Sequence, residues 1–338
     1  MIKTYSNKYG LLYNIFFLLI FVLLFSIAAF RPIGAVRDAA SYARAIQSFT
    51  ITHHYNFIQL EPSFYLIVDA SKFLFNDVVR GVFILYAFLG VSLTLYAIKK
   101  NSSFPLLSLI VFSCSYFLLH EMTQIRVAVA AAIFLWAIPD IVNRNWKSYL
   151  IKTALATSFH YVAIIMLFIY LINSKNNKQL FYLFLPLIGI LLNIINVGKF
   201  LLMSMISFLP KFINFKLNLY LEAIKIGKFG TINVNSGLLM IFYLMIYYFA
   251  IVNIKRFKLP IDIVLLKIVG WMLFSLYFFS FLPVLAFRIS EFIGVVLIFF
   301  LPDLISIIRE KFFMSFIVIL YSISMLFNYI FVQKLFQF

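Results

Sequence analysis

The charged residues of this sequence stand where long apolar runs begin or end. Residues 127–138 are wholly apolar, and the short segment just before them carries His120, Glu121, Gln124 and Arg126. A guanidinium offers a planar fork of N–H donors that suits a phosphate. The start of a helix adds free backbone N–H groups that also attract an anion. This pattern predicts that Arg126 belongs to an anion site at the mouth of a helix.

Three further arginines have comparable positions. Arg31 follows the first apolar run, Arg37 lies in the polar segment after it, and Arg288 begins a later run. Arginines that converge on one face could bind and neutralise a diphosphate. The alternative is that each arginine binds lipid headgroups or pairs with a nearby carboxylate.

His160 is the side chain best suited to proton transfer near neutral pH. It lies between Ser158 and Tyr161 in the largely apolar stretch 148–172. If two half-helices meet at His160, its imidazole faces a cavity and can act as a general base or donate to a phosphate. If the stretch is one long span, His160 is a core residue bonded to a backbone carbonyl. The sequence also contains rival bases, namely Asp38, Glu61, Glu121 and Glu291.

The composition predicts the environment of these residues. The 338 residues are 64% hydrophobic and only 12% charged, which excludes a soluble globular domain. Many apolar runs approach the roughly 20 residues that a helix needs to cross a bilayer, and backbone in lipid must bond internally. The sequence therefore predicts an all-α polytopic membrane protein, one domain over residues 1–338, with about 9–11 transmembrane helices.

The net charge of +17 could suggest a nucleic-acid partner. The basic residues, however, lie in the loops between apolar runs, where lipid phosphates or a phosphate-bearing substrate are better partners. We therefore expect no nucleic acid.

Two stretches decide the topology, because each is able to span or to re-enter. Residues 61–75 are short for a span and contain Pro62, which favours a re-entrant or surface helix. If 61–75 and 148–172 both return to the side on which they start, and the N-terminus is inside, the tight basic loops fall inside. The loops 31–60 and 198–235 then lie outside, on the same face as the candidate residues.

Motifs of metal-dependent and nucleotide-dependent enzymes are absent from the sequence. It contains no Asp-x-Asp, no His-Glu-x-x-His and no phosphate-binding glycine loop. The adjacent His53 and His54 have no third ligand at a usable spacing. The single cysteine, Cys114, rules out an internal disulfide. We therefore expect neither a metal ion nor another cofactor.

The order of the polar motifs resembles that in EpsG-like and Wzy-type polymerases of O-antigen or exopolysaccharide. The motifs are Arg37-Asp38 with Tyr42, Glu61-Pro62-Ser63-Phe64, Gln124-Ile125-Arg126, Phe159-His160 and Phe287-Arg288. The resemblance implies a bacterial inner-membrane glycosyltransferase with an architecture like that of membrane GT-C enzymes. Such an enzyme moves a growing glycan from undecaprenyl diphosphate onto a lipid-linked repeat unit at the periplasmic face, without a required metal.

The resemblance also implies roles and partners. Arg126, Arg288, Arg31 and Arg37 would bind the leaving diphosphate. His160, Asp38 or Glu121 would accept the proton of the attacking hydroxyl. Gln124, Glu61, Tyr42, His120 and Glu291 would contact sugar or support the site. Partners would be undecaprenyl-diphosphate-linked oligosaccharides, membrane lipids, and the flippase and chain-length regulator of the same pathway.

The alternative function is that of a flippase or transporter of lipid-linked oligosaccharides. Its cationic residues would line a central cavity accessible from both faces. Here the candidate residues cluster towards one face, which favours the polymerase.

Overall fold

Helices make up every regular element in the residues that the computed structural model describes, which are 7–36, 38–175, 178–205, 208, 211–225 and 237–336. In the first half of the chain these are α1 (Asn7–Ala29), η1 (Ile33–Ala35), α2 (Ala39–Thr52), α3 (Pro62–Leu74), α4 (Val78–Asn101), α5 (Pro105–Val111), η2 (Phe112–Glu121), α6 (Ile125–Val142), α7 (Trp146–Phe159), η3 (Tyr161–Ile165) and α8 (Met166–Ile169). In the second half they are α9 (Gln179–Ile194), α10 (Val197–Met205), α11 (Lys211–Lys225), α12 (Leu238–Val252), η5 (Ile254–Arg256), α13 (Pro260–Phe278), α14 (Pro283–Gly294), α15 (Leu297–Asp303), η6 (Leu304–Ile307), α16 (Lys311–Phe327) and η7 (Asn328–Val332). The predicted all-α polytopic membrane class is confirmed.

Five helices of the described chain are long and apolar enough to cross a membrane, namely Gly10–Ala29, Val78–Asn101, Ile125–Val142, Pro260–Phe278 and Lys311–Val332. Two bent pairs also pass this test: α9 with α10, bent by 69°, and α14 with α15 and η6, bent by 56°. Two shorter apolar helices, Pro105–Glu121 and Leu239–Val252, accompany them. The lower end of the predicted range of 9–11 is reached only when bent pairs and short helices count as spans, because polar and irregular breaks shorten several runs.

Local chemistry explains where several helices begin. The Asp77 side chain accepts a hydrogen bond from the backbone N–H of Arg80 at 3.0 Å and caps α4. Proline occupies the first turn of four helices (α3, α5, α13 and α14), where a missing N–H costs nothing. These starts place Glu61 immediately before α3 and Arg288 in the second turn of α14.

Residues 146–172 form a helical hairpin. The helices α7 and η3 meet at His160, whose φ of −152° and ψ of 123° are extended. The 14 residues of α7 extend about 21 Å, which is less than the hydrocarbon thickness of about 30 Å. Tyr149 donates to the carbonyl of Met166 at 2.9 Å and ties the two arms together. Of the two possibilities for this stretch, the pair of half-helices meeting at His160 is therefore the one adopted.

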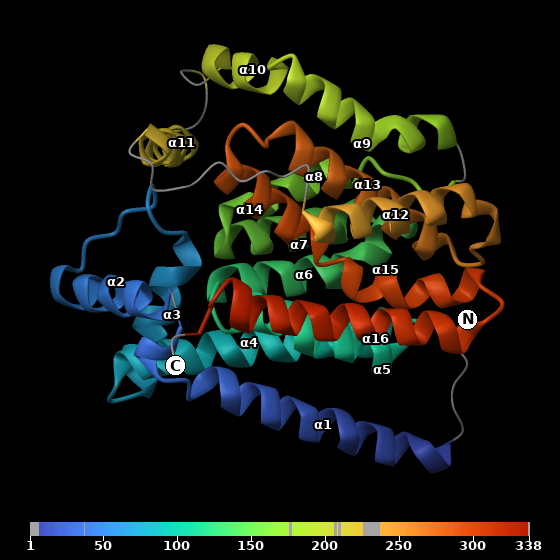
Figure 1. Cartoon of the computed structure of the whole chain (residues 1–338). Coiled ribbons are helices and arrows are strands. Elements are labelled where there is room, and N and C mark those ends of the chain that lie inside the picture. The colour runs from blue at the N-terminus through green and yellow to red at the C-terminus, as the bar shows by residue number, and fades with distance from the viewer. Residues whose placement is uncertain are drawn as a thin grey trace.

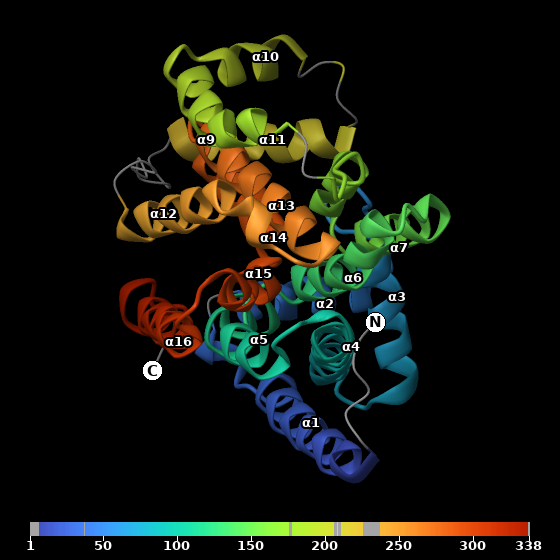
Figure 2. The ribbon, with the colours of Figure 1, turned by 90° about the vertical axis from the view of Figure 1, so that its right-hand side faces the viewer.

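The base of this hairpin is held by a buried lysine. Lys267 Nζ of α13 lies 2.9 Å from both the carbonyl and the side-chain oxygen of Asn173 and 2.7 Å from the carbonyl of Lys175. These carbonyls follow the second arm, where no further helical N–H is available to them. In the view of Figure 2 the hairpin helix α7 lies beside α6 and α3.

The helices α2, α3 and α11 lie at one end of the bundle. Figure 1 shows the long helices crossing the view, with α2, α3 and α11 at the end where α1 finishes and the first turns of α1 at the opposite end. At this end Arg80 Nη1 of α4 donates to the carbonyl of Arg31 at 2.7 Å and connects α4 to the segment that follows α1. At the other end Lys99 bonds the Asn14 side chain at 2.5 Å. The loop that begins at Arg31, predicted outside, and the loop that begins at Lys99, predicted inside, thus lie at opposite ends of the fold.

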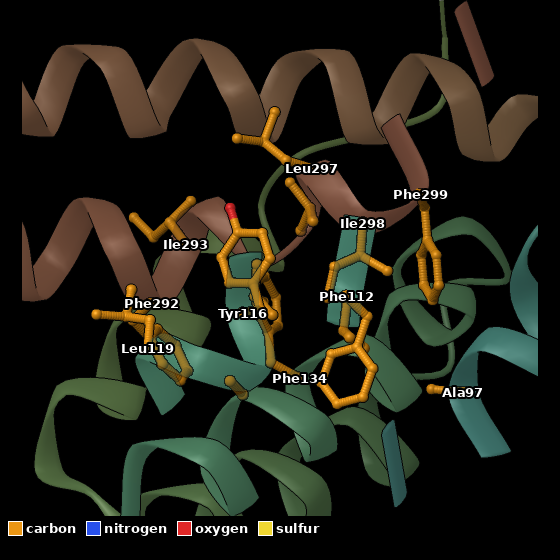
Figure 3. Packing of buried hydrophobic residues seen from close by; sticks show 14 of the residues in the cluster. Ala97, Phe112, Tyr116, Leu119, Phe134, Phe292, Ile293, Leu297, Ile298 and Phe299 are labelled. Carbon is orange, nitrogen blue, oxygen red and sulfur yellow. The ribbon is translucent and has the colours of Figure 1, made fainter. Parts of the chain in front are cut away.

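Close packing around α6 joins α14 to the rest of the bundle. The rings of Phe134 and Phe292 stack with centroids 5.5 Å apart and an interplanar angle of 19°. Figure 3 shows both residues within the buried hydrophobic cluster. Alanines at positions 128, 130, 131, 132 and 137 of α6 are all buried, which lets neighbouring helices approach closely. This contact holds the helix that carries Arg288 and Glu291 against the helix that carries Arg126.

Candidate functional site

An ion pair between Glu61 and Arg126 is the centre of the candidate site. Glu61 is fully buried, whereas 15% of the Arg126 side chain stays exposed, and Arg126 Nη1 donates to Glu61 Oε2. Glu61 lies just before α3 and Arg126 in the first turn of α6, so the pair joins the loop before α3 to a helix long and apolar enough to cross a membrane. Because the pair is buried, leaving either charge alone would be strongly unfavourable.

Polar and aromatic groups surround Arg126 on its other sides. Its guanidinium lies over the Tyr42 ring, 5.5 Å from the centroid. Within the described chain, Arg126 Nε is buried without a hydrogen-bond partner, and the Ser63 and Tyr86 hydroxyls are buried beside it, close enough to interact with each other. Buried polar atoms without partners are rare and point to a ligand that would satisfy them. The remaining donors of Arg126 could therefore bind an anion while Glu61 holds the other side.

The tip of the helical hairpin reaches the same pair. The backbone N–H of Tyr161 donates to Glu61 Oε1 at 3.4 Å, and its hydroxyl donates to the carbonyl of Phe57 at 2.6 Å. Burial and the neighbouring Glu61 charge raise the pKa of the Tyr161 hydroxyl, so it stays neutral near pH 7. Tyr161 thus fastens the hairpin tip to the outer loop that ends at Glu61.

His160 lies at the break itself and is 5% exposed. Its Nδ1 accepts a hydrogen bond from the backbone N–H of Val162 at 3.3 Å and caps η3. An imidazole nitrogen that accepts must be unprotonated, so this geometry favours the neutral form with the proton on Nε2. In that form His160 is a hydrogen-bond donor through Nε2, which corresponds to the second of the two roles that the sequence left open, a donor to phosphate and not a general base.

Arg288 reaches the cluster through a tyrosine of α11. The Arg288 guanidinium lies 5.3 Å from the centroid of the Tyr220 ring, and Arg288 is exposed. Tyr220 is also close enough to Glu61 and Arg126 for their charges to act on its hydroxyl, and burial raises its pKa. Tyr220 therefore lies near both Arg288 and Arg126, which the sequence assigned to one phosphate site.

The amide of Gln124 connects this cluster to Glu291. Gln124 Nε2 donates to Glu291 Oε2 at 3.4 Å, across a sequence separation of 167 residues. His120 is 2% exposed and its ring lies 5.6 Å from that of Tyr116, and Gln124 is a polar side chain beside it. His120 and Gln124 thus line the region between the ion pair and α14.

Arg31 and Glu121 form a second buried group with a different character. Arg31 Nη1 donates to the carbonyls of Ala28 at 2.6 Å and Glu121 at 3.1 Å, and its guanidinium covers the Phe83 ring at 4.5 Å. Burial lowers the pKa of Arg31 to about 10, which leaves it charged at neutral pH. The Glu121 carboxylate packs against Gly90 of α4. Both residues are enclosed by helix backbone, which favours support of the fold.

Asp38 lies at the start of α2, one turn before Tyr42, and is partly buried. Residues four apart on a helix share a face, so Asp38 is on the side of α2 that carries the ring over Arg126. Arg37 is outside the described residues. In the described chain no group of three or more His, Cys, Asp or Glu side chains could hold a metal ion.

Three of these contacts were not expected from the sequence. Tyr86, Tyr161 and Tyr220 all approach the ion pair, yet nothing in the sequence separates Tyr86 or Tyr220 from the other members of a set of 20 tyrosines. For Tyr161 alone a signal existed, because it follows His160 directly. The spacing of Tyr86 within α4 looks like that of any packed aromatic residue.

Comparison with known proteins gives one match. The sequence model of the EpsG family matches residues 14–338, which is nearly the whole chain. No curated protein and no solved structure matches. Together with the all-helical membrane architecture, this match confirms the resemblance noted in the order of the polar motifs. The chain is a multi-pass membrane protein that belongs to the EpsG family.

Proposed function

We propose that this protein is a polysaccharide polymerase that transfers a growing glycan from undecaprenyl diphosphate onto a lipid-linked repeat unit. Family membership supports a polymerase-type role, and the outer cluster of arginines supports a diphosphate-bearing donor. We place the enzyme in the bacterial inner membrane with the cluster facing the periplasm. The donor and the acceptor would reach the site laterally, from the lipid.

The chemistry is a displacement at the anomeric carbon of the donor glycan. The bond from this carbon to the diphosphate oxygen breaks, and the diphosphate leaves with the electron pair. A hydroxyl of the acceptor sugar forms the new glycosidic bond and gives up its proton. The leaving group gains negative charge as the reaction proceeds, so preorganised positive groups lower the barrier.

Arg126 would stabilise that charge with the donors that Glu61 does not use. Arg288, which is exposed beside Tyr220, would bind the same diphosphate from the opposite side. His160 would donate from Nε2 to a phosphate oxygen, because its Nδ1 accepts from the backbone. Neutralisation by protein groups makes a metal ion unnecessary in this scheme.

Asp38 is our choice for the proton acceptor. Glu61 is engaged by Arg126, and Glu121 is enclosed against Gly90, so neither is well placed to meet an acceptor hydroxyl. Asp38 lies one turn from Tyr42 at the edge of the cluster. Arg31, with its backbone partners, would support the fold at this end and not touch substrate.

The observation that carries the proposal is the Arg126–Glu61 pair. It is a largely buried arginine with a partly exposed side, one of its own donors, Nε, is without a partner, and the tip of the helical hairpin is bonded to Glu61. A purely structural pair needs none of these surroundings.

The test replaces Arg126 by Lys, which keeps the charge but removes the fork of donors. The purified protein is reconstituted with lipid-linked repeat units isolated from cells that lack it, and product length is measured on gels. We expect polymer formation to fall about 10²–10³-fold, as for loss of one transition-state donor. The matched control is Arg44→Lys, because Arg44 is exposed on α2 and bonds only Ser41 in its own helix.

Two outcomes would contradict the proposal. Full-length polymer from the Arg126→Lys protein would remove Arg126 from the site. Wild-type protein that moves repeat units across the bilayer without joining them would indicate a flippase. In cells the two functions can be distinguished by the glycan on the lipid core. Loss of a polymerase leaves single repeat units attached to the lipid core, whereas loss of a flippase leaves no repeat units there.

A further inference from the structure

A cavity of about 80 Å³ lies at the same end of the bundle, between η2, the start of α12, the end of α13, α14, and η7. Its aromatic lining consists of Tyr116, Tyr243, Tyr329 and Phe287. Its aliphatic lining consists of Leu119, Leu239, Met240, Met272, Leu276, Leu297 and Met325. Its polar lining beyond the phenols consists of Ser290, Glu291 and Gln333. A cavity with mixed aromatic and polar walls differs from the purely apolar voids that are left by imperfect packing.

The cavity leads from the surface into the bundle. Gln333 is exposed, whereas Tyr329, one turn earlier, is 6% exposed. At the inner end the hydroxyl of Tyr116 donates to the carbonyl of Gly294, and Figure 3 shows this hydroxyl pointing towards the α14–α15 junction near Ile293 and Leu297. A ligand could therefore enter beside Gln333 and reach Tyr116.

The cavity adjoins the proposed phosphate site in two ways. Glu291 accepts from Gln124, which lies two residues before Arg126. Arg288 and Glu291 are three residues apart on α14, so they are on neighbouring parts of one helix face. A molecule that occupies the cavity is thus placed next to a diphosphate held by Arg288 and Arg126.

The lining narrows the class of ligand. A hydrocarbon chain would fit the aliphatic wall but would place apolar groups against the polar side chains of Ser290, Glu291 and Gln333, which is unfavourable. A second anion would be repelled by the same carboxylate. A neutral sugar ring meets both conditions, since its C–H face packs on aromatic rings and its hydroxyls donate to carboxylate and amide oxygens.

The size of the cavity limits how much of a glycan it can hold. Each ordered water needs about 10–15 Å³ of cavity volume. The cavity is therefore large enough for several waters or for most of one sugar ring. An oligosaccharide would have to continue outside, past Gln333. We propose that this cavity binds a single neutral sugar ring of the acceptor repeat unit, with Glu291 accepting a hydrogen bond from one of its hydroxyls. This proposal rests on the polymerase function proposed above.

The test uses the free repeat-unit oligosaccharide, released from its lipid by mild acid, as a competitor in the reconstituted polymerisation assay. We expect it to inhibit the wild-type protein competitively with the lipid-linked acceptor. For Glu291→Gln we expect its inhibition constant to rise about tenfold or more, the usual effect of losing a hydrogen bond to a charged group. Binding of undecaprenyl diphosphate alone should stay unchanged.

A second variant and a control guard against a folding defect. Gln333→Leu changes an exposed residue at the cavity mouth and should weaken inhibition in the same direction. Glu222→Gln is the matched control, because Glu222 is exposed on α11 and does not line the cavity. Thermal unfolding of each variant establishes that its fold is retained.

The failures of the two proposals are distinguishable. The sugar site would be overturned if Glu291→Gln and Gln333→Leu both kept the inhibition constant of the wild type. It would also be overturned if the free oligosaccharide did not inhibit the wild type. In either case, polymerisation by the wild-type protein would leave the proposed function standing. Equal loss of oligosaccharide and undecaprenyl-diphosphate binding would assign the cavity to the diphosphate and also overturn it. Absence of any polymer from wild-type protein would instead refute the proposed function.

Discussion

The Glu61–Arg126 pair has two roles that can be separated at the scale of single residues. A buried ion pair adds little net stability, but removing one partner leaves a charge in a medium of low polarity and costs about 3–5 kcal/mol. Loss of activity in a single variant therefore mixes damage to the fold with damage to the site.

A paired substitution separates these effects. Glu61→Ala or Arg126→Ala alone should lower the thermal unfolding temperature clearly, whereas Glu61→Leu combined with Arg126→Met should recover most of that loss. The double variant should still make no polymer, because the diphosphate has lost its donor. Polymer formation by the stable double variant would show that the pair is only structural.

His160 allows a similar separation, because its two ring nitrogens have different surroundings. The Asn side-chain oxygen can take the place of Nδ1 and accept from Val162 N–H, but Asn has no group in the place of Nε2. His160→Asn should therefore keep the unfolding temperature near that of the wild type and lose polymerisation. His160→Ala should both lower the unfolding temperature and abolish polymerisation. An active His160→Asn protein would confine His160 to capping η3.

At the scale of elements, the site depends on how closely α4 and the π-helical segment η2 approach each other. A π-helix is usually short, and here η2 runs over ten residues before the turn that leads to Arg126. Its last residue, Glu121, lies directly on Gly90 of α4. A Cβ atom at position 90 would be 2.2 Å from a carboxylate oxygen of Glu121.

Gly90→Val should therefore destabilise the protein and displace the start of α6. We expect a lower unfolding temperature together with reduced polymerisation, measured on purified protein. Gly10→Val is the control, since a Cβ at Gly10 would meet no atom within 4 Å. Equal stability of the two variants would mean that α4 and η2 are less tightly packed than this contact requires.

The hairpin of α7 and η3 is a further element on which the site depends. Both arms of the hairpin begin at its base, where Lys267 binds the carbonyl of Asn173. The tip of the hairpin lies at the opposite end, where the backbone N–H of Tyr161 donates to Glu61. A simple span could not present a helix break there, because its backbone would continue to pair within the helix. The re-entrant arrangement lets His160 and Tyr161 face the cluster from inside the bundle.

At the scale of the whole molecule, the arrangement of charged loops predicts which residues face each side of the membrane. Single cysteines placed in a Cys114→Ser background test this with a thiol reagent that cannot cross membranes. A cysteine at Arg44 should be labelled from the periplasmic side of spheroplasts. A cysteine at the exposed Glu310, at the opposite end, should be labelled only after permeabilisation. The reverse pattern would place the candidate site in the cytoplasm and contradict the proposed function.

The sequence by itself determined the class and the ordered motifs of this protein. Apolar runs of membrane length leave helices as the solution, and the polar motifs at their ends are visible without a structure. The break at His160 and the short helix after Glu61 were also predictable, because polar residues and proline interrupt those runs.

Only the tertiary structure decided which of these groups meet. Glu61 and Arg126 are 65 residues apart, and Gln124 and Glu291 are 167 apart, so no local pattern joins them. The sequence offered four arginines for one phosphate site, yet packing encloses Arg31 under helix carbonyls and leaves Arg126 and Arg288 near the same residue, Tyr220. Side-chain roles depend on burial and on partners from other helices, and these are set when the helices pack together.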